Sequence, residues 1–127
     1  MTADTPTMRR ILLADDNSSL RSSLAMALNG RGFETVEAEC GAEALKLGND
    51  ERPDLSLLDI NMPDMTGVDV LRGWIESGLN FPVIFMTAER NKELRVQAQD
   101  LGALCVLDKP FGADEFIGVI QRSLGSA

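Results

Sequence analysis

Short apolar runs alternate along the chain with longer stretches in which apolar residues recur every three or four positions. The runs cover residues 11–14, 33–38, 55–58, 82–86 and 104–107. Most of them are apolar almost without interruption, and each is bounded by polar residues, glycine or proline. Such runs are typical of β-strands that are covered on both faces, as in a parallel sheet. The run at 33–38 is weaker and alternates between two faces.

The stretches between the runs have the period of amphipathic helices. Residues with this spacing are Leu20, Leu24 and Leu28; Ala42, Ala44 and Leu45; Val68, Leu71 and Ile75; Leu94, Ala98 and Leu101; and Phe116, Ile117, Ile120 and Leu124. Asn17 and Ser18 can cap the first helix, and a loop at 64–67 precedes the third. Helix stops are expected at Gly32, Gly78 and Gly102.

Five repeats of strand followed by helix predict an α/β fold. Right-handed crossovers then give a five-stranded parallel sheet with five helices on its two faces. A length of 127 residues suits one domain that buries its own core. We expect that domain to span residues 9–125, after a flexible lead at 1–8.

The net charge and the cysteine content limit the partners and the cellular compartment that we expect. A net charge of −8 disfavours a broad nucleic-acid or anionic-membrane surface, so we expect no direct nucleic-acid binding and no membrane insertion. Cys40 and Cys105 are far apart, and a disulfide framework is not expected, which fits a reducing compartment. Cys105 stands in the apolar stretch ALCVL and is expected to be buried. Without a signal-peptide pattern, a cytoplasmic location is the expectation.

Polar residues follow four of the five predicted strands. Because ligands bind outside the carboxyl ends of parallel strands, these residues are the candidate site. The arrangement requires the first, third, fourth and fifth strands to be neighbours, with the second at the rim. The residues are Asp15 and Asp16, Asp59, Thr87 and Ala88, and Lys109 with Pro110.

Three carboxylates at one edge repel one another unless a cation offsets their charge. Mg²⁺ accepts oxygen ligands and works with phosphate oxygens, so it is the expected ion. Lys109 adds a second positive charge, and the Thr87 hydroxyl can donate a hydrogen bond to a phosphoryl oxygen. Asp59 follows the central apolar run and is the best candidate nucleophile for phosphoryl transfer. Asp15 and Asp16 are better placed to hold the metal.

Four motifs together resemble the receiver domains of two-component response regulators. They are ILLADDN, SLLDINMPDMTG, PVIFMTA and LDKPF, and the resemblance covers roughly residues 9–124. It implies a flavodoxin-like strand order 2-1-3-4-5. It also implies a phosphoprotein of a two-component system or phosphorelay that carries an aspartyl phosphate.

The resemblance further implies the role of each site residue. Asp59 is the phosphoacceptor. Asp16 and Asp59 ligate Mg²⁺ directly, with the backbone carbonyl of Asn61, whereas Asp15 acts mostly through a water. The remaining implied roles are these: Thr87 and Lys109 contact phosphoryl oxygens, backbone N–H groups near Asn61 and Ala88 assist them, and a cis bond before Pro110 orients Lys109.

The phosphoryl donor implied by the resemblance is a phosphohistidine on a separate histidine kinase or histidine phosphotransfer protein. This chain has no histidine and cannot be its own donor. Phosphorylation is expected to draw Thr87 inward and to switch the face of the fourth helix and fifth strand for a partner protein. Val106 stands where many members have Tyr or Phe, which leaves open whether that face moves less or signals through the loop backbone. Asn61 and Glu89 occupy positions that tune hydrolysis in the family.

Other functions remain open at this point. The chain is either a stand-alone receiver or a receiver belonging to a longer regulator, for example a DNA-binding one. An Asp-nucleophile phosphatase usually has a second Asp two residues after the nucleophile, and Asn61 stands there. We therefore expect no enzyme activity beyond self-catalysed phosphotransfer and autodephosphorylation. A nucleotide- or flavin-binding domain would need glycine-rich motifs that the chain lacks.

A few residues carry packing expectations. Trp74 is expected to be partly buried, and Met62, Met65 and Met86 are expected to pack rather than bind. The basic residues that begin the fourth predicted helix are expected to form a solvated face that contacts partners; they are Arg90, Lys92 and Arg95.

Overall fold

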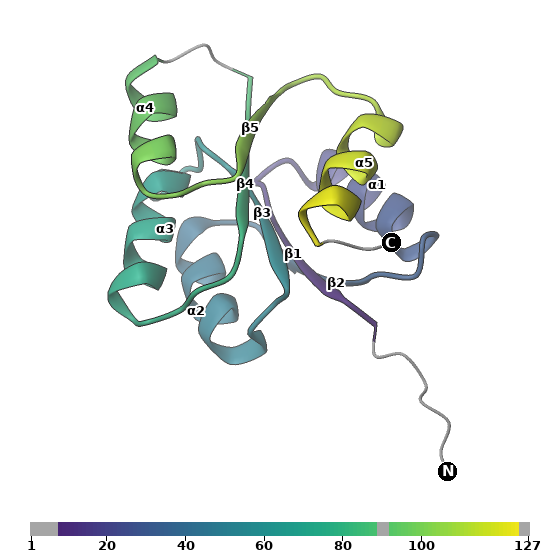
Figure 1. Cartoon of the computed structure of the whole chain (residues 1–127), viewed down its shortest axis with the longest axis horizontal. Helices are drawn as coiled ribbons and strands as arrows, with labels where there is room; N and C mark the ends of the chain where they lie inside the picture. Colours follow the sequence, from purple (N-terminus) through teal and green to yellow (C-terminus); the bar gives the residue numbers. More distant parts are fainter. Residues whose placement is uncertain (1–7, 89–91, 125–127) are drawn as a thin grey trace.

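Five parallel strands form one sheet in the order β2-β1-β3-β4-β5, as a computed structural model shows (Figure 1). The structure describes residues 8–88 and 92–124. The strands are β1 (Arg10–Ala14), β2 (Glu34–Ala38), β3 (Leu55–Asp59), β4 (Val83–Thr87) and β5 (Cys105–Asp108). The predicted α/β class and strand order are confirmed. Asp59 and Thr87, expected just after their strands, are the last residues of β3 and β4.

Five helices cover the two faces of the sheet, as predicted (Figure 1). Helices α1 (Ser18–Asn29) and α5 (Ala113–Ser123) lie on one face. Helices α2 (Gly41–Glu51), α3 (Gly67–Glu76) and α4 (Lys92–Asp100) lie on the other. Within the described residues, no helix is both long enough and apolar enough to cross a membrane.

Alternate residues of the central strands supply two separate cores. In β1, Ile11 and Leu13 face α1 and α5, whereas Leu12 and Ala14 face α2 and α3. Each fully buried Leu or Ile contributes about 1.5–3 kcal/mol relative to exposure. Because both faces are covered, β3 and β4 are buried at every position, which explains their nearly continuous apolar runs, interrupted within β3 by Ser56.

Most helix ends follow the sequence signals. Asn17 is the N-cap of α1, and its side chain accepts a hydrogen bond from the Leu20 N–H (3.1 Å); Ser18 is the first helical residue. The three glycines predicted to stop helices all have positive φ angles, between 81° and 93°. Glycine adopts that conformation without steric cost. They are Gly32, Gly78 and Gly102.

Trp74 and Ile75 correct the expectation for α3. Trp74 is not partly buried but 1% exposed. It packs edge-on against Phe81, with ring centroids 4.9 Å apart, and its Nε1–H donates to the Leu45 carbonyl (3.3 Å). Gly48 of α2 makes the room, because a Cβ there would lie 2.2 Å from the indole nitrogen. With Trp74 turned inward, the next residue, Ile75, is rotated out of the predicted stripe and is 46% exposed.

The start of β5 and of α4 shows further differences. Leu104, expected within the fifth strand, precedes it and is 49% exposed. Cys105, expected to be buried, is only partly so. Of the predicted basic face, Lys92 is exposed, and Arg95 forms an ion pair with Asp108 (2.6 Å). Arg90 and Glu89 lie outside the described residues. As expected, Met86 is fully buried; Met62 is nearly so, and Met65 packs partly buried against the same core.

Candidate functional site

Strand register brings the predicted site residues to one edge of the sheet. Ala14 pairs with Leu58, so the acid pair after β1 lies beside Asp59 at the end of β3. Asp59 pairs with Met86, which places Thr87 next to it on β4. The backbone N–H of Lys109 donates to the Thr87 carbonyl (2.7 Å), which brings the residue after β5 to the same place.

Three carboxylates meet at this edge. One oxygen from each of Asp15, Asp16 and Asp59 lies within 4.8 Å of the others. Asp15 is 1% exposed and Asp59 5%, whereas Asp16 is exposed to solvent. Two buried acids and one accessible acid therefore form a partly open cluster.

Lys109, which directly follows β5, reaches into this cluster. Its ammonium donates to Asp15 Oδ2 (2.7 Å) and lies 3.3 Å from Asp59 Oδ2. The Lys109–Pro110 peptide bond is cis, as the resemblance implied. Burial by itself lowers the pKa of the Lys109 ammonium. The hydrogen bond to Asp15 and the charges of Asp59 and Asp15 outweigh burial, so that pKa lies above its usual value.

Asp59 is the acid whose ionisation the fold opposes. Burial, and then the negative charge of Asp15, raise the pKa of Asp59 from 3.8 to about 6. Lys109 and the backbone N–H of Asn61, 3.2 Å from Asp59 Oδ1, oppose this shift without cancelling it. At neutral pH the carboxylate is ionised but under-compensated, so a cation beside it is favoured.

The donor set fits a hard divalent cation. Three carboxylates and one ammonium leave two negative charges at the edge. Oxygen ligands with access to solvent through Asp16 suit Mg²⁺, which usually keeps several waters. The residues that could hold such an ion are Asp15, Asp16, Asp59 and the backbone carbonyl of Asn61.

The loop after β3 is closed at its base and tied at its tip. Asn61 and Thr66 form an isolated antiparallel bridge, and the Gly67 N–H donates to the Ile60 carbonyl (2.7 Å). At the tip, the Asp64 carboxylate accepts from the first two N–H groups of α2 (2.8 Å each). The loop that carries Asn61 is therefore held against two helices.

The remaining predicted residues lie where the sequence placed them, though with unequal exposure. Thr87 is buried at the end of β4, and Ala88 next to it is exposed. Val106 lies in β5 opposite Phe85 and is only partly buried. The position of Glu89 is not among the described residues.

Two residues near the edge have contacts that the sequence did not predict. Asp64 was expected only to be part of a loop, and its contact with α2 depends on tertiary packing. Arg21 of α1 contacts the backbone of Asp15, as described below. The contact of Arg21 can be predicted only once β2 is known to lie beside β1, because its second partner, Glu37, belongs to β2.

Comparison with known proteins gives a consistent result. A family model described as the response regulator receiver domain matches residues 11–121. Sporulation initiation phosphotransferase F of Bacillus subtilis (strain 168) is 36% identical over 115 residues, covering 91% of this chain and 93% of that protein. The transcriptional regulatory protein KdpE of Mycobacterium tuberculosis (strain H37Rv) is 37% identical over 120 residues, or 92% of this chain. The chain spans only 51% of KdpE.

Solved structures agree with the sequence relatives. The signal receiver domain of the putative response regulator NarL from Mycobacterium tuberculosis superposes with a TM-score of 0.86 at 29% identity, covering 96% of this chain and all of that one. The match to the family model spans every strand except the first residue of β1, and it includes all the acids of the edge and Lys109. The chain belongs to the response regulator receiver domain family of two-component signalling.

Proposed function

We propose that this domain accepts a phosphoryl group on Asp59 from a phosphohistidine of a histidine kinase or histidine phosphotransfer protein. One observation carries the proposal above all others. Asp59 is a buried carboxylate at the end of β3, within 4.8 Å of Asp15 and Asp16 and 3.3 Å from the Lys109 ammonium. Such a cluster is suited to binding a divalent cation and a phosphoryl group together.

The proposed metal is Mg²⁺, held by Asp16, Asp59 and the Asn61 carbonyl directly and by Asp15 mostly through water. When bound, it neutralises charge on the phosphoryl oxygens. Supporting this choice, the edge carries an excess of two negative charges before any ion binds.

In the proposed step, an Asp59 oxygen attacks phosphorus and the P–N bond to the donor imidazole breaks. The imidazole nitrogen keeps the bonding electrons, and an acyl phosphate forms on Asp59. Lys109 offsets charge on the phosphoryl oxygens, while the Thr87 hydroxyl and the Ala88 N–H donate to them. Attack by water later releases inorganic phosphate and restores the carboxylate, so the domain turns over no external substrate.

We further propose that phosphorylation biases the face formed by α4 and β5 for binding a partner protein. Thr87 is the link, because it ends β4 and its carbonyl accepts from Lys109. Val106 lies on this face in place of an aromatic residue, so the loop backbone after β4 is the proposed carrier of the signal. We propose that this occurs in the cytoplasm, with residues 9–125 as the working domain after a flexible lead at 1–8.

Two settings for the domain have support from relatives. Membership of a longer, DNA-binding regulator is supported by the transcriptional regulators of which this chain covers about half. A single-domain relay component is supported by sporulation initiation phosphotransferase F, 93% of which is covered. The natural reading frame around the sequence distinguishes them.

The test is labelling with acetyl phosphate, measured by intact mass with and without Mg²⁺. We expect one added phosphoryl group in wild type that requires Mg²⁺ and is absent in Asp59→Asn. Asp54→Asn is the matched control, because Asp54 immediately precedes the same strand at its opposite end. Labelling that persists in Asp59→Asn would remove Asp59 as the sole acceptor.

A further inference from the structure

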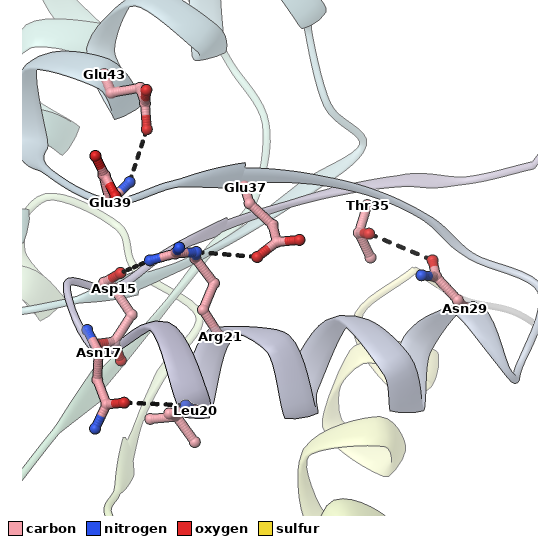
Figure 2. Close-up of polar contacts among 9 residues, drawn as sticks. All are labelled: Asp15, Asn17, Leu20, Arg21, Asn29, Thr35, Glu37, Glu39 and Glu43. Carbon is pink, nitrogen blue, oxygen red and sulfur yellow. Dashed lines mark hydrogen bonds and ion pairs between the residues drawn. The ribbon is translucent and has the colours of Figure 1, made fainter.

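We infer that Arg21 is a positioning residue, one that holds the β1–α1 turn in the conformation that metal binding by the acid pair requires. This inference rests on the proposed function. The Arg21 guanidinium Nη1 donates to the backbone carbonyl of Asp15 (2.7 Å), and its Nε donates to Glu37 Oε1 (3.0 Å). Figure 2 shows the side chain rising from α1 between these two partners. Only 13% of it is exposed, so the contact is shielded from competing water.

The carbonyl that Arg21 holds belongs to the peptide joining Asp15 to Asp16. The other polar groups of Asp15 are also fixed. Its N–H donates to the Ala38 carbonyl (3.1 Å), its Oδ1 accepts from the Asn17 N–H (2.9 Å), and its Oδ2 accepts from Lys109. The orientation of the Asp15–Asp16 peptide sets the direction in which the exposed Asp16 side chain leaves the turn. Arg21 therefore sets the orientation of Asp16, the most exposed of the three acids.

Because Glu37 pairs with Arg21, we infer that Arg21 acts by orienting the turn and not through its positive charge. An unpaired guanidinium so near the acids would compete with a metal ion for their charge. The ion pair with Glu37 offsets the charge of Arg21. A guanidinium also presents several donors in one plane, so it can satisfy a carbonyl and a carboxylate together, which a lysine cannot do in the same way. Through this pair β2, which supplies no residue to the acid cluster, still supports it.

The molecule contains its own control for this arrangement. Arg10 of β1 pairs with Glu34 at the amino end of β2, whereas Arg21 of α1 pairs with Glu37 nearer the carboxyl end of β2. Glu34 and Glu37 lie on one strand with similar side-chain exposure, 45% and 41%. Arg10 and Glu34 are far from the acids along the strands, so their removal tests general loss of an arginine–glutamate pair.

The experiment titrates Mg²⁺ against the rate of acetyl phosphate labelling. For Arg21→Gln, we expect the Mg²⁺ concentration at half-maximal rate to rise about 10-fold, as for other residues that orient metal ligands, while the rate at saturating Mg²⁺ changes little. Glu37→Gln should raise this Mg²⁺ concentration by a smaller factor. The variant with both substitutions should raise it no further than Arg21→Gln alone. Arg21→Lys should rescue in part. Arg10→Gln should leave it unchanged.

A metal-free readout separates this inference from the proposed function. Loosening the turn should speed hydrogen exchange of the Asn17 amide, which donates to Asp15 Oδ1, in Arg21→Gln but not in Arg10→Gln. If wild type is not labelled, the proposed function fails, and faster Asn17 exchange still supports the positioning role. An unchanged Mg²⁺ requirement in a folded Arg21→Gln, or an equal rise in Arg10→Gln, would overturn it. If Arg21→Gln does not fold, Glu37→Gln decides by the same two measurements.

Discussion

The charged residues at the two ends of the sheet differ in their exposure and in the number of partners that compensate them. At the amino end, Arg10 of β1 is surrounded by acceptors: Glu34 (2.5 Å), the Glu51 carbonyl (3.0 Å), and Asp54, which accepts from the Arg10 backbone N–H (2.7 Å). The side chains of Arg10, Glu34 and Glu51 are 38–45% exposed. At the carboxyl end, Asp15 and Asp59 are almost fully buried and share one lysine.

The difference appears in the ionisation of the two sites. Hydrogen bonding and charge from Glu34 raise the pKa of Arg10, so the fold favours the charge that this residue already carries. Burial and the charge of Asp15 raise the pKa of Asp59 to about 6, so the fold opposes the charge that Asp59 carries at pH 7. The charges at the amino end are thus compensated by partners near the surface. The buried acids at the carboxyl end form a cluster that could bind a metal, and their negative charge is only partly compensated by Lys109.

Removal of Lys109 should have the largest effect, because it leaves the buried acids at the carboxyl end without their cation. Lys109→Met leaves the buried Asp15 carboxylate without the donor 2.7 Å away, and we expect the free energy of unfolding to fall by about 1–3 kcal/mol at pH 7. Labelling at Asp59 should fall sharply as well. Urea unfolding in EDTA measures the first effect and intact mass the second. Full stability in Lys109→Met would mean that solvent already compensates Asp15.

Neutralising Asp59 should have the opposite effect, because it removes one of the poorly compensated negative charges at the carboxyl end. In metal-free protein at pH 7.5, we expect Asp59→Asn to raise the free energy of unfolding by about 1–2 kcal/mol after allowance for screening by solvent. The pKa in the fold, about 6, exceeds the ordinary value of 3.8. The folded wild type therefore binds the proton more tightly than the unfolded chain does. The contribution of Asp59 to stability is therefore greatest below about pH 4 and is lost as the pH rises through about 6.

The measurement is urea unfolding of wild type and Asp59→Asn at several pH values between 4 and 7.5, with EDTA. The advantage of the variant should be largest at pH 7.5 and should disappear near pH 4. Added Mg²⁺ should stabilise wild type more than the variant, because Asn cannot replace a carboxylate ligand fully. An advantage that does not change with pH would show that packing, rather than ionisation, separates the two proteins.

The same contrast explains what the sequence could predict. The carboxyl end was predictable because its residues directly follow apolar runs, and parallel strands place such residues together. Asp59, Lys109 and the acid pair needed only strand order to be brought to one edge. Local patterns thus sufficed for the strands, the helices and the residues of the cluster, whereas the strand order came from the resemblance to receiver domains.

Features that depend on contacts between distant elements were not predictable in the same way. The burial of Trp74 depends on a gap over Gly48 in another helix, and its consequence is the exposure of Ile75. The hold of Arg21 on Asp15 depends on the register that brings Glu37 beside β1. A charged residue on a helix is usually solvated, so neither the type nor the spacing of Arg21 marked it.

The smallest expected effect is at the amino end. Glu34→Gln removes an ion pair between exposed side chains, and such pairs contribute little because solvent and salt screen them. We expect a small drop in thermal stability at low ionic strength, less than half of that caused by Lys109→Met, which fades in 1 M salt. Melting curves of both variants at low and high salt provide the check. The Lys109→Met deficit should persist in salt because its partner is buried. If the two deficits were equally sensitive to salt, the carboxyl end would be as open to solvent as the amino end, and burial could not be the source of the raised pKa of Asp59.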